Sequence, residues 1–170
     1  MAPAHQDTEI IRELYNRYHQ DIYRFARYTL GDASIAYDVV QEVFLRALRS
    51  WDNFRHGAHE KTWLLSIARN YMHDYMRKQK KRERFMFQYE PPFISDETLA
   101  VETAMVLEQA LMSLKKTYRQ VFMLRHIENL SIAETAQILG WSQGKVRTTD
   151  YRAIASLRCL LGANAEEVNP

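Results

Sequence analysis

Apolar side chains recur every three or four positions along most of this 170-residue chain, which is the spacing of an α-helix that buries one face. In the first half, the pattern predicts helices over residues 7–30, from Asp32 or Ser34 to about Trp51, and from a cap at Thr62 into a basic end. In the second half it predicts helical segments at 98–114, 117–128, 131–139 and 143–161. No stretch alternates apolar and polar residues for long enough to indicate a strand, so we predict an all-α protein.

The helical pattern breaks once, between residues 90 and 96, where two adjacent prolines cannot continue a helix. We therefore predict two small helical domains, at 8–85 and 98–162, joined by a flexible linker at 86–97 and followed by a tail at 163–170.

The periodicity also predicts which side chains pack inward. In the first helix these are Ile10, Ile11, Leu14, Tyr15, Tyr18, Ile22, Phe25 and Ala26. In the third they are Trp63, Leu64, Ile67, Ala68, Tyr71 and Tyr75. The single cysteine, Cys159, stands among leucines and is expected to be a buried structural thiol.

Composition excludes several classes of protein. No run reaches the ~18–20 apolar residues of a membrane span, and the first residues lack the pattern of a secretion signal. One cysteine cannot form an internal disulfide, which suits a reducing cytosol, so we expect a cytoplasmic protein. Neither the six histidines nor any glycine loop has the spacing of a metal, phosphate or nucleophile site. We expect no enzymatic activity, cofactor, metal or small-molecule substrate.

Residues 131–153 have the pattern of a DNA-binding helix-turn-helix. Ser131 and Glu134 form a capping box, Gly140 supplies the turn, Ser142 caps the second helix and Val146 faces the core. The first helix buries Ile132, Ala136, Ile138 and Leu139, and the second presents Gln143, Lys145, Arg147, Thr148, Tyr151 and Arg152 outward. Such side chains can reach bases or phosphates; the alternative is an ordinary helical hairpin with a solvated basic face.

The helix containing Asp38 carries a mixed polar face opposite its valines. Asp38, Gln41, Glu42, Leu45 and Arg46 share that face at spacings of three and four. A leucine exposed among acids and an amide suggests a protein-docking surface, although the pattern alone fits a solvated face equally well.

The segment from Arg69 to Arg84 holds seven basic and two acidic side chains, with Tyr71 and Tyr75 interleaved. Basic charge releases counterions from phosphate, and aromatic faces stack on unpaired bases. The charge favours contact with a DNA backbone, whereas the tyrosines fit a role in the core at least as well.

Four motifs in order resemble the extracytoplasmic-function (ECF) sigma factors of bacterial RNA polymerase. They are Asp38-Val-Val-Gln-Glu-Val-Phe-Leu-Arg-Ala47, Thr62-Trp-Leu-Leu-Ser-Ile-Ala-Arg-Asn70, Arg119-Gln-Val-Phe-Met-Leu-Arg125 and the helix-turn-helix. The resemblance spans about residues 8–162, and residues 60–69 and 145–149 are most similar to the sigma-X branch.

The resemblance implies a stress-response initiation factor that binds core RNA polymerase, at the largest-subunit clamp helices and at the flap, together with promoter DNA and a cognate anti-sigma factor. Core docking would involve Asp38, Gln41, Glu42 and Leu45. Minus-ten DNA would be met by Arg55, His56, Lys61, Trp63, Asn70, Arg77, Lys78, Lys80 and Lys81, with a base flipped into the loop at 55–61. Minus-thirty-five DNA would be met by Ser142, Gln143, Lys145, Arg147, Thr148, Tyr151 and Arg152. The alternative function is a stand-alone helix-turn-helix regulator, while a helical hydrolase or metalloprotein lacks the ligands.

Two residues depart from the family's pattern. Tyr37 stands where many members carry an acid, which makes the docking face less negative. Asp150 lies within the reading helix, where phosphate would repel it. We expect Asp150 to point inward or pair with Arg147 or Lys145, or else to accept a hydrogen bond from a cytosine.

Overall fold

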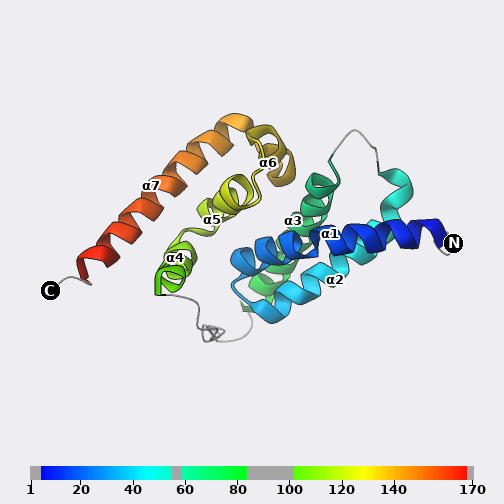
Figure 1. The fold of residues 1–170 in the computed structure, drawn as a ribbon, viewed down its shortest axis with the longest axis horizontal. Coiled ribbons are helices and arrows are strands. Elements are labelled where there is room, and N and C mark those ends of the chain that lie inside the picture. The colour runs from blue at the N-terminus through cyan, green and yellow to red at the C-terminus, as the bar shows by residue number, and fades with distance from the viewer. Residues whose placement is uncertain (1–4, 55–58, 84–101, 168–170) are drawn as a thin grey trace. The chain divides into compact units, whose positions relative to one another are not determined.

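The computed structural model describes residues 5–54, 59–83 and 102–167 and divides the chain into two compact units, Met1–Pro92 and Phe93–Pro170 (Figure 1). The predicted linker at 86–97, the expected DNA contacts Arg55 and His56, and Arg84 lie outside the described residues. Every regular element in the described ranges is helical, which confirms the all-α prediction.

The first unit consists of α1 (His5–Leu30), α2 (Ala33–Ser50), the short 3₁₀ turn η1 (Trp51–Asn53) and α3 (Glu60–Glu83). Gly31 ends α1 with a positive φ of 76°, a conformation that glycine adopts without strain. Asp32, rather than Ser34, caps α2 by accepting a hydrogen bond from the Ile35 amide at 2.9 Å. The chain thus reverses within two residues, and α2 runs back along α1 (Figure 1).

Each of these three helices packs against the other two around an apolar core. Helix α2 buries Val39, Val40, Val43, Phe44 and Ala47, while Leu48, whose spacing also predicts an inward position, is half-buried. Helix α1 contributes Leu14, Ile22, Phe25 and Ala26. Tyr15 was predicted to face inward but is exposed, because its ring lies on the rim against the rings of His19 and Phe44.

The side chains of α3 that face the core are not all those predicted, because the helix is rotated about its axis relative to the prediction. Its buried residues are Thr62, Leu64, Leu65, Ala68 and Met72, whereas Trp63, Ile67, Tyr71 and Tyr75 are only half-buried. The helix also begins at Glu60, before the predicted cap Thr62. Aromatic rings at 63, 71 and 75 biased the predicted stripe, but they lie beside the core, where large amphipathic rings can remain partly in water.

The second unit consists of α4 (Glu102–Ser113), α5 (Lys116–Phe122), the π-helical turn η2 (Met123–Ile127), α6 (Ile132–Leu139) and α7 (Gln143–Glu167). Its core includes Leu124, Leu139, Val146 and Ala153. Helix α7 continues beyond the predicted end at residue 161. Cys159 is exposed, so the prediction of a buried thiol is wrong; the inward residue of that turn is Leu157.

Candidate functional site

The helix-turn-helix is built as the sequence predicts. Ser131 and Glu134 cap α6 reciprocally, with hydrogen bonds of 3.1 and 2.8 Å. Gly140 then takes a left-handed conformation with φ of 66°, which turns the chain into α7. Ser142 accepts a hydrogen bond from the Lys145 amide at 3.2 Å, and Val146 is fully buried. The start and the inward face of α7 are therefore fixed by local contacts.

The side chains expected to read DNA are exposed just before α7 and along its first half. They are Ser142, Gln143, Lys145, Arg147, Thr148, Tyr151 and Arg152, and Tyr151 is 77% exposed. The Lys145 ammonium lies 3.9 Å from the centre of the Trp141 ring, a cation–π contact that holds the lysine near the start of the helix. Ile132 of α6, predicted to be buried, is half-buried.

Asp150 stands within this exposed series but its carboxylate turns away from it. One oxygen lies 2.8 Å from His126 Nε2 and the other 3.6 Å from Arg125 Nε, both in η2. Its side chain is only 14% exposed. The expectation that Asp150 points inward is confirmed, whereas the expected partners Arg147 and Lys145 are replaced by Arg125 and His126.

The polar face of α2 carries a stripe of exposed residues at Tyr37, Asp38, Gln41 and Leu45. Glu42 is half-buried and accepts a hydrogen bond from Arg46 Nε at 2.7 Å. The Arg46 guanidinium lies 5.0 Å from the centre of the Tyr71 ring of α3. Burial, and then the nearby carboxylates of Glu42 and Asp38, raise the pKa of the Tyr71 phenol. Tyr71 thus forms an edge of this face, which the sequence pattern did not indicate.

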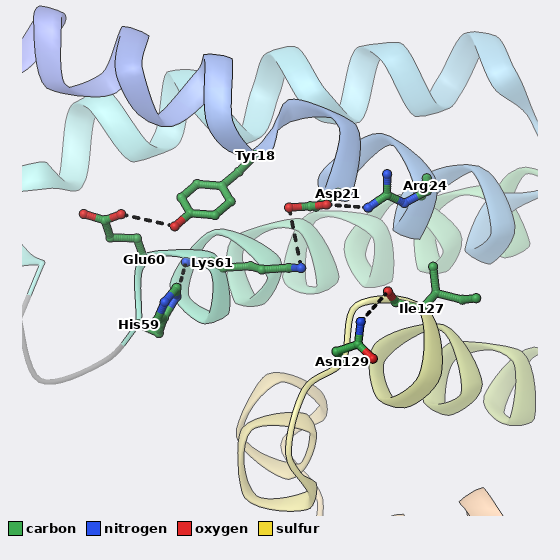
Figure 2. Close-up of polar contacts among 8 residues, drawn as sticks. All are labelled: Tyr18, Asp21, Arg24, His59, Glu60, Lys61, Ile127 and Asn129. Atoms are coloured by element: carbon green, nitrogen blue, oxygen red, sulfur yellow. Dashed lines mark hydrogen bonds and ion pairs between the residues drawn. The ribbon is translucent and has the colours of Figure 1, made fainter.

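The start of α3 is fastened to α1 by polar contacts (Figure 2). Asp21 of α1 forms ion pairs with Arg24 and, at 3.5 Å, with the Lys61 ammonium. Glu60 accepts hydrogen bonds from Tyr18 at 3.4 Å and from Arg17 at 3.3 Å. The Lys61 side chain is only 18% exposed, so this lysine belongs to the joint between the helices rather than to an open basic surface.

Aromatic rings from η1, from Phe54 and from the start of α3 pack together. Trp63 of α3 packs against Phe54, with ring centres 4.7 Å apart, and against Trp51 at 5.9 Å. This ring cluster joins η1 to α3. Farther along α3, Asn70 is exposed and accepts a hydrogen bond from Arg69 at 3.2 Å.

The C-terminal end of α3 presents an exposed basic surface. Its members are Arg77, Lys78, Lys80, Lys81 and Arg82. Arg77 forms an exposed ion pair with Asp74 at 3.2 Å, and Tyr75 accepts a hydrogen bond from Gln79 at 2.7 Å. The two tyrosines of this segment are half-buried and engaged by neighbouring polar side chains.

Within the described residues, no group of three His, Cys, Asp or Glu side chains could hold a metal ion. The helices of that part of the chain are also too short or too polar to cross a membrane.

Comparison with known proteins agrees with this architecture of a three-helix unit followed by a helix-turn-helix unit. Residues 14–82 match the model of sigma-70 region 2, and residues 104–157 match that of sigma-70 region 4. The ECF RNA polymerase sigma factor SigX of Bacillus subtilis is 38% identical, over 88% of this chain and 82% of the relative. SigM of Mycobacterium tuberculosis H37Rv is 34% identical, over 92% and 79%.

Solved structures show the same fold. The sigma factor RpoE of Bartonella quintana, in complex with the anti-sigma factor NepR, superposes with a TM-score of 0.80 at 24% identity, over 89% of this chain and 96% of that one. CnrH, in complex with the cytosolic domain of CnrY, gives a TM-score of 0.66 at 25% identity, over 92% and 90%. The chain belongs to the ECF sigma factors of the sigma-70 family. Like its family, it directs transcription initiation by RNA polymerase.

Proposed function

We propose that this sigma factor docks on core RNA polymerase through the exposed face of α2, and reads and opens the promoter through α3 and α7. The observation that carries the proposal is the exposed series of α7. Six side chains capable of contacting DNA stand on this helix, with Ser142 just before its start, and the start and inward face of the helix are fixed. The protein would act by binding and positioning, without an enzymatic activity of its own.

Core docking is assigned to the stripe of Asp38, Gln41 and Leu45, with Glu42 beside it. A leucine surrounded by polar groups is the composition of a small interface with an apolar centre and a polar rim. We assign direct polar contacts with the polymerase to Asp38 and Gln41. Because Glu42 is already paired with Arg46, we propose that it supports the docking face without contacting the polymerase directly. The partner surface would be the clamp helices of the largest polymerase subunit.

Minus-ten recognition is assigned to α3. Asn70 and Trp63 would lie close to the opened strand, while Arg77, Lys78, Lys80 and Lys81 would contact its backbone. The position of Lys61 supports a different role, because its ammonium is engaged by Asp21. We therefore propose that Lys61 holds α3 against α1.

Minus-thirty-five recognition is assigned to Gln143, Lys145, Arg147, Thr148, Tyr151 and Arg152, with Ser142 at the helix start. An arginine can donate two hydrogen bonds to guanine, and a helix N-terminus suits a phosphate. Both domains, at about 8–85 and 98–162, would have to engage one promoter together, with the polymerase flap supporting the second.

Regulation would come from a cognate anti-sigma factor, since the RpoE structure contains an anti-sigma factor. We place the protein in the cytoplasm with its polymerase. The stand-alone regulator is the weaker candidate, because a protein of that class has no need of a polymerase-docking face.

The docking assignment is tested by measuring the affinity of the labelled protein for core RNA polymerase. Asp38→Ala combined with Gln41→Ala should weaken binding by about tenfold or more, because central interface contacts contribute most of the affinity. Asn16→Ala combined with Asp52→Ala likewise removes one amide and one carboxylate, from exposed positions elsewhere, and should leave affinity unchanged. If the wild type and both double variants bind core RNA polymerase with equal affinity, the exposed face of α2 is not part of the interface.

A further inference from the structure

Asp150 is the one residue in the first half of α7 whose position conflicts with DNA reading. A carboxylate near phosphate is repelled, yet Asp150 stands between Arg147 and Tyr151, which are both exposed. The conflict is resolved by the contacts of Asp150 with η2, which direct its charge away from the exposed series.

The contacts connect three parts of the second unit. His126 Nε2 lies 2.8 Å from one Asp150 oxygen, and Arg125 Nε lies 3.6 Å from the other. Arg125 also donates a hydrogen bond to the carbonyl oxygen of Leu130, the residue before the capping serine of α6. The reading helix is thereby fastened both to η2 and to the entrance of the helix-turn-helix.

The π-helical form of η2 provides the geometry for this connection. Glu128 donates to the Met123 carbonyl at 2.9 Å, and Leu130 donates to the Leu124 carbonyl at 3.0 Å, both wider loops than the α-helical bond. Consecutive side chains of a wider turn diverge less, which allows Arg125 and His126 to reach the same carboxylate. Phe122 supports the imidazole, with ring centres 4.9 Å apart.

We propose that Asp150 is a positioning residue for minus-thirty-five recognition, and that the Arg125–His126–Asp150 cluster sets the rotation of α7 about its own axis. Thr148 and Arg152 lie two residues to either side of Asp150, on nearly the opposite side of the helix, about 160° away. Holding Asp150 therefore fixes the direction in which those side chains enter the groove. Geometric tolerance for such contacts is about 10–20°.

The positioning role of Asp150 rests on the proposed role of α7. A simpler explanation is that Asp150 contributes only its negative charge. If charge were its whole effect, neutralising it would strengthen binding to every DNA sequence. If it positions the helix, neutralising it weakens binding to the native minus-thirty-five element in particular. The two readings predict opposite signs.

The test uses the full chain assembled with core RNA polymerase. The measured quantity is the ratio of affinities for a promoter with its native minus-thirty-five element and for one in which only that element is scrambled. Asp150→Ala and His126→Ala should each reduce the ratio, Asp150→Ala by about tenfold, and the double variant should lose little more than the Asp150→Ala variant because the residues act as one unit. Asp52→Asn removes an equal charge from η1 and should leave the ratio unchanged.

Thermal unfolding of each variant separates positioning from loss of fold, and His126→Ala tests the cluster from the other side should Asp150→Ala be unstable. Asp150→Ala or His126→Ala proteins that keep the native ratio, or that bind both promoters more tightly, would overturn the inference. If the wild-type assembly binds the native and the scrambled promoter equally well, α7 does not read the minus-thirty-five element. The proposed role of Asp150 would then fail as well.

Discussion

Arg147 is the side chain of α7 best suited to read a base, since it is exposed next to the buried Val146 that holds its turn of helix in place. Arg147→Ala should cost ~1–3 kcal/mol of promoter binding, and the loss should concentrate at one base pair of the minus-thirty-five element. The measurement is the affinity of the polymerase complex for promoters substituted one base pair at a time. An equal loss on every promoter would make Arg147 a phosphate contact.

Lys61 was expected to contact minus-ten DNA, but its ion pair with Asp21 supports a role in holding α3 against α1. Lys61→Met keeps the aliphatic stem but removes the charge that faces Asp21, so it should lower the free energy of unfolding by ~1–3 kcal/mol, between the values for exposed and buried pairs. It should leave unchanged the slope of promoter affinity against salt. Denaturant unfolding and a salt titration measure the two effects.

The variant that combines Lys80→Gln with Lys81→Gln is to be compared with Lys61→Met in stability and in salt dependence. Both lysines are exposed, so this variant should show the reverse pattern, with unaltered stability and a salt slope reduced by up to ~2. A flatter slope for Lys61→Met would return Lys61 to the DNA contacts.

Residue-level prediction from the sequence mostly succeeded where a side chain acts locally, although α3 begins before the predicted cap Thr62, and it failed where a side chain acts at a distance. Asp32, Ser131 and Ser142 bind amides three residues ahead, a spacing visible in the chain. Asp150 binds His126, 24 residues away, and Tyr71 meets Arg46 across two helices. No periodicity encodes such pairs, since they depend on how helices pack.

At the scale of elements, the turn at Gly140 sets the angle between α6 and α7. A Cβ at this position would meet nothing within 4 Å, so the cost of Gly140→Ala comes from its φ of 66° alone. We expect a loss of ~1–2 kcal/mol in the free energy of unfolding. Denaturant unfolding of the full chain is the measurement.

Gly144→Ala provides the matched control, because its Cβ also meets nothing within 4 Å but the residue lies inside α7. It should leave stability unchanged or raise it by up to ~1 kcal/mol, since alanine favours helix. Equal effects of the two substitutions would show that the left-handed turn is unimportant for stability.

The sequence predicted where helices form, but it did not always predict which face of a helix points to the core. The valine stripe of α2 has one best inward direction, and its prediction was confirmed. In α3, apolar and aromatic residues surround much of the helix, so several rotations bury a similar area. The contacts of Leu65 and Met72 with the rest of the core select among them, and these contacts are tertiary. The π-helical turn η2 likewise has no signal in the periodicity.

At the scale of the whole molecule, the order of the motifs was more informative than any one of them. The Asp38 face alone fits a solvated helix, and the helix-turn-helix alone fits many regulators. Their order along one chain indicated the sigma-factor family, and the region 2 and region 4 matches with the 38% identical SigX confirmed it.

The central claim, that this chain directs core RNA polymerase to promoters, is tested most directly by run-off transcription on a library of randomised promoters with and without the protein. We expect initiation that depends on the protein and shares a two-part motif. Selection for the minus-thirty-five part should be weakened in the Asp150→Ala variant and relaxed at one base pair in the Arg147→Ala variant. Sequence-selective binding of the protein alone to duplex DNA, with no added initiation, would contradict this account and favour a stand-alone regulator.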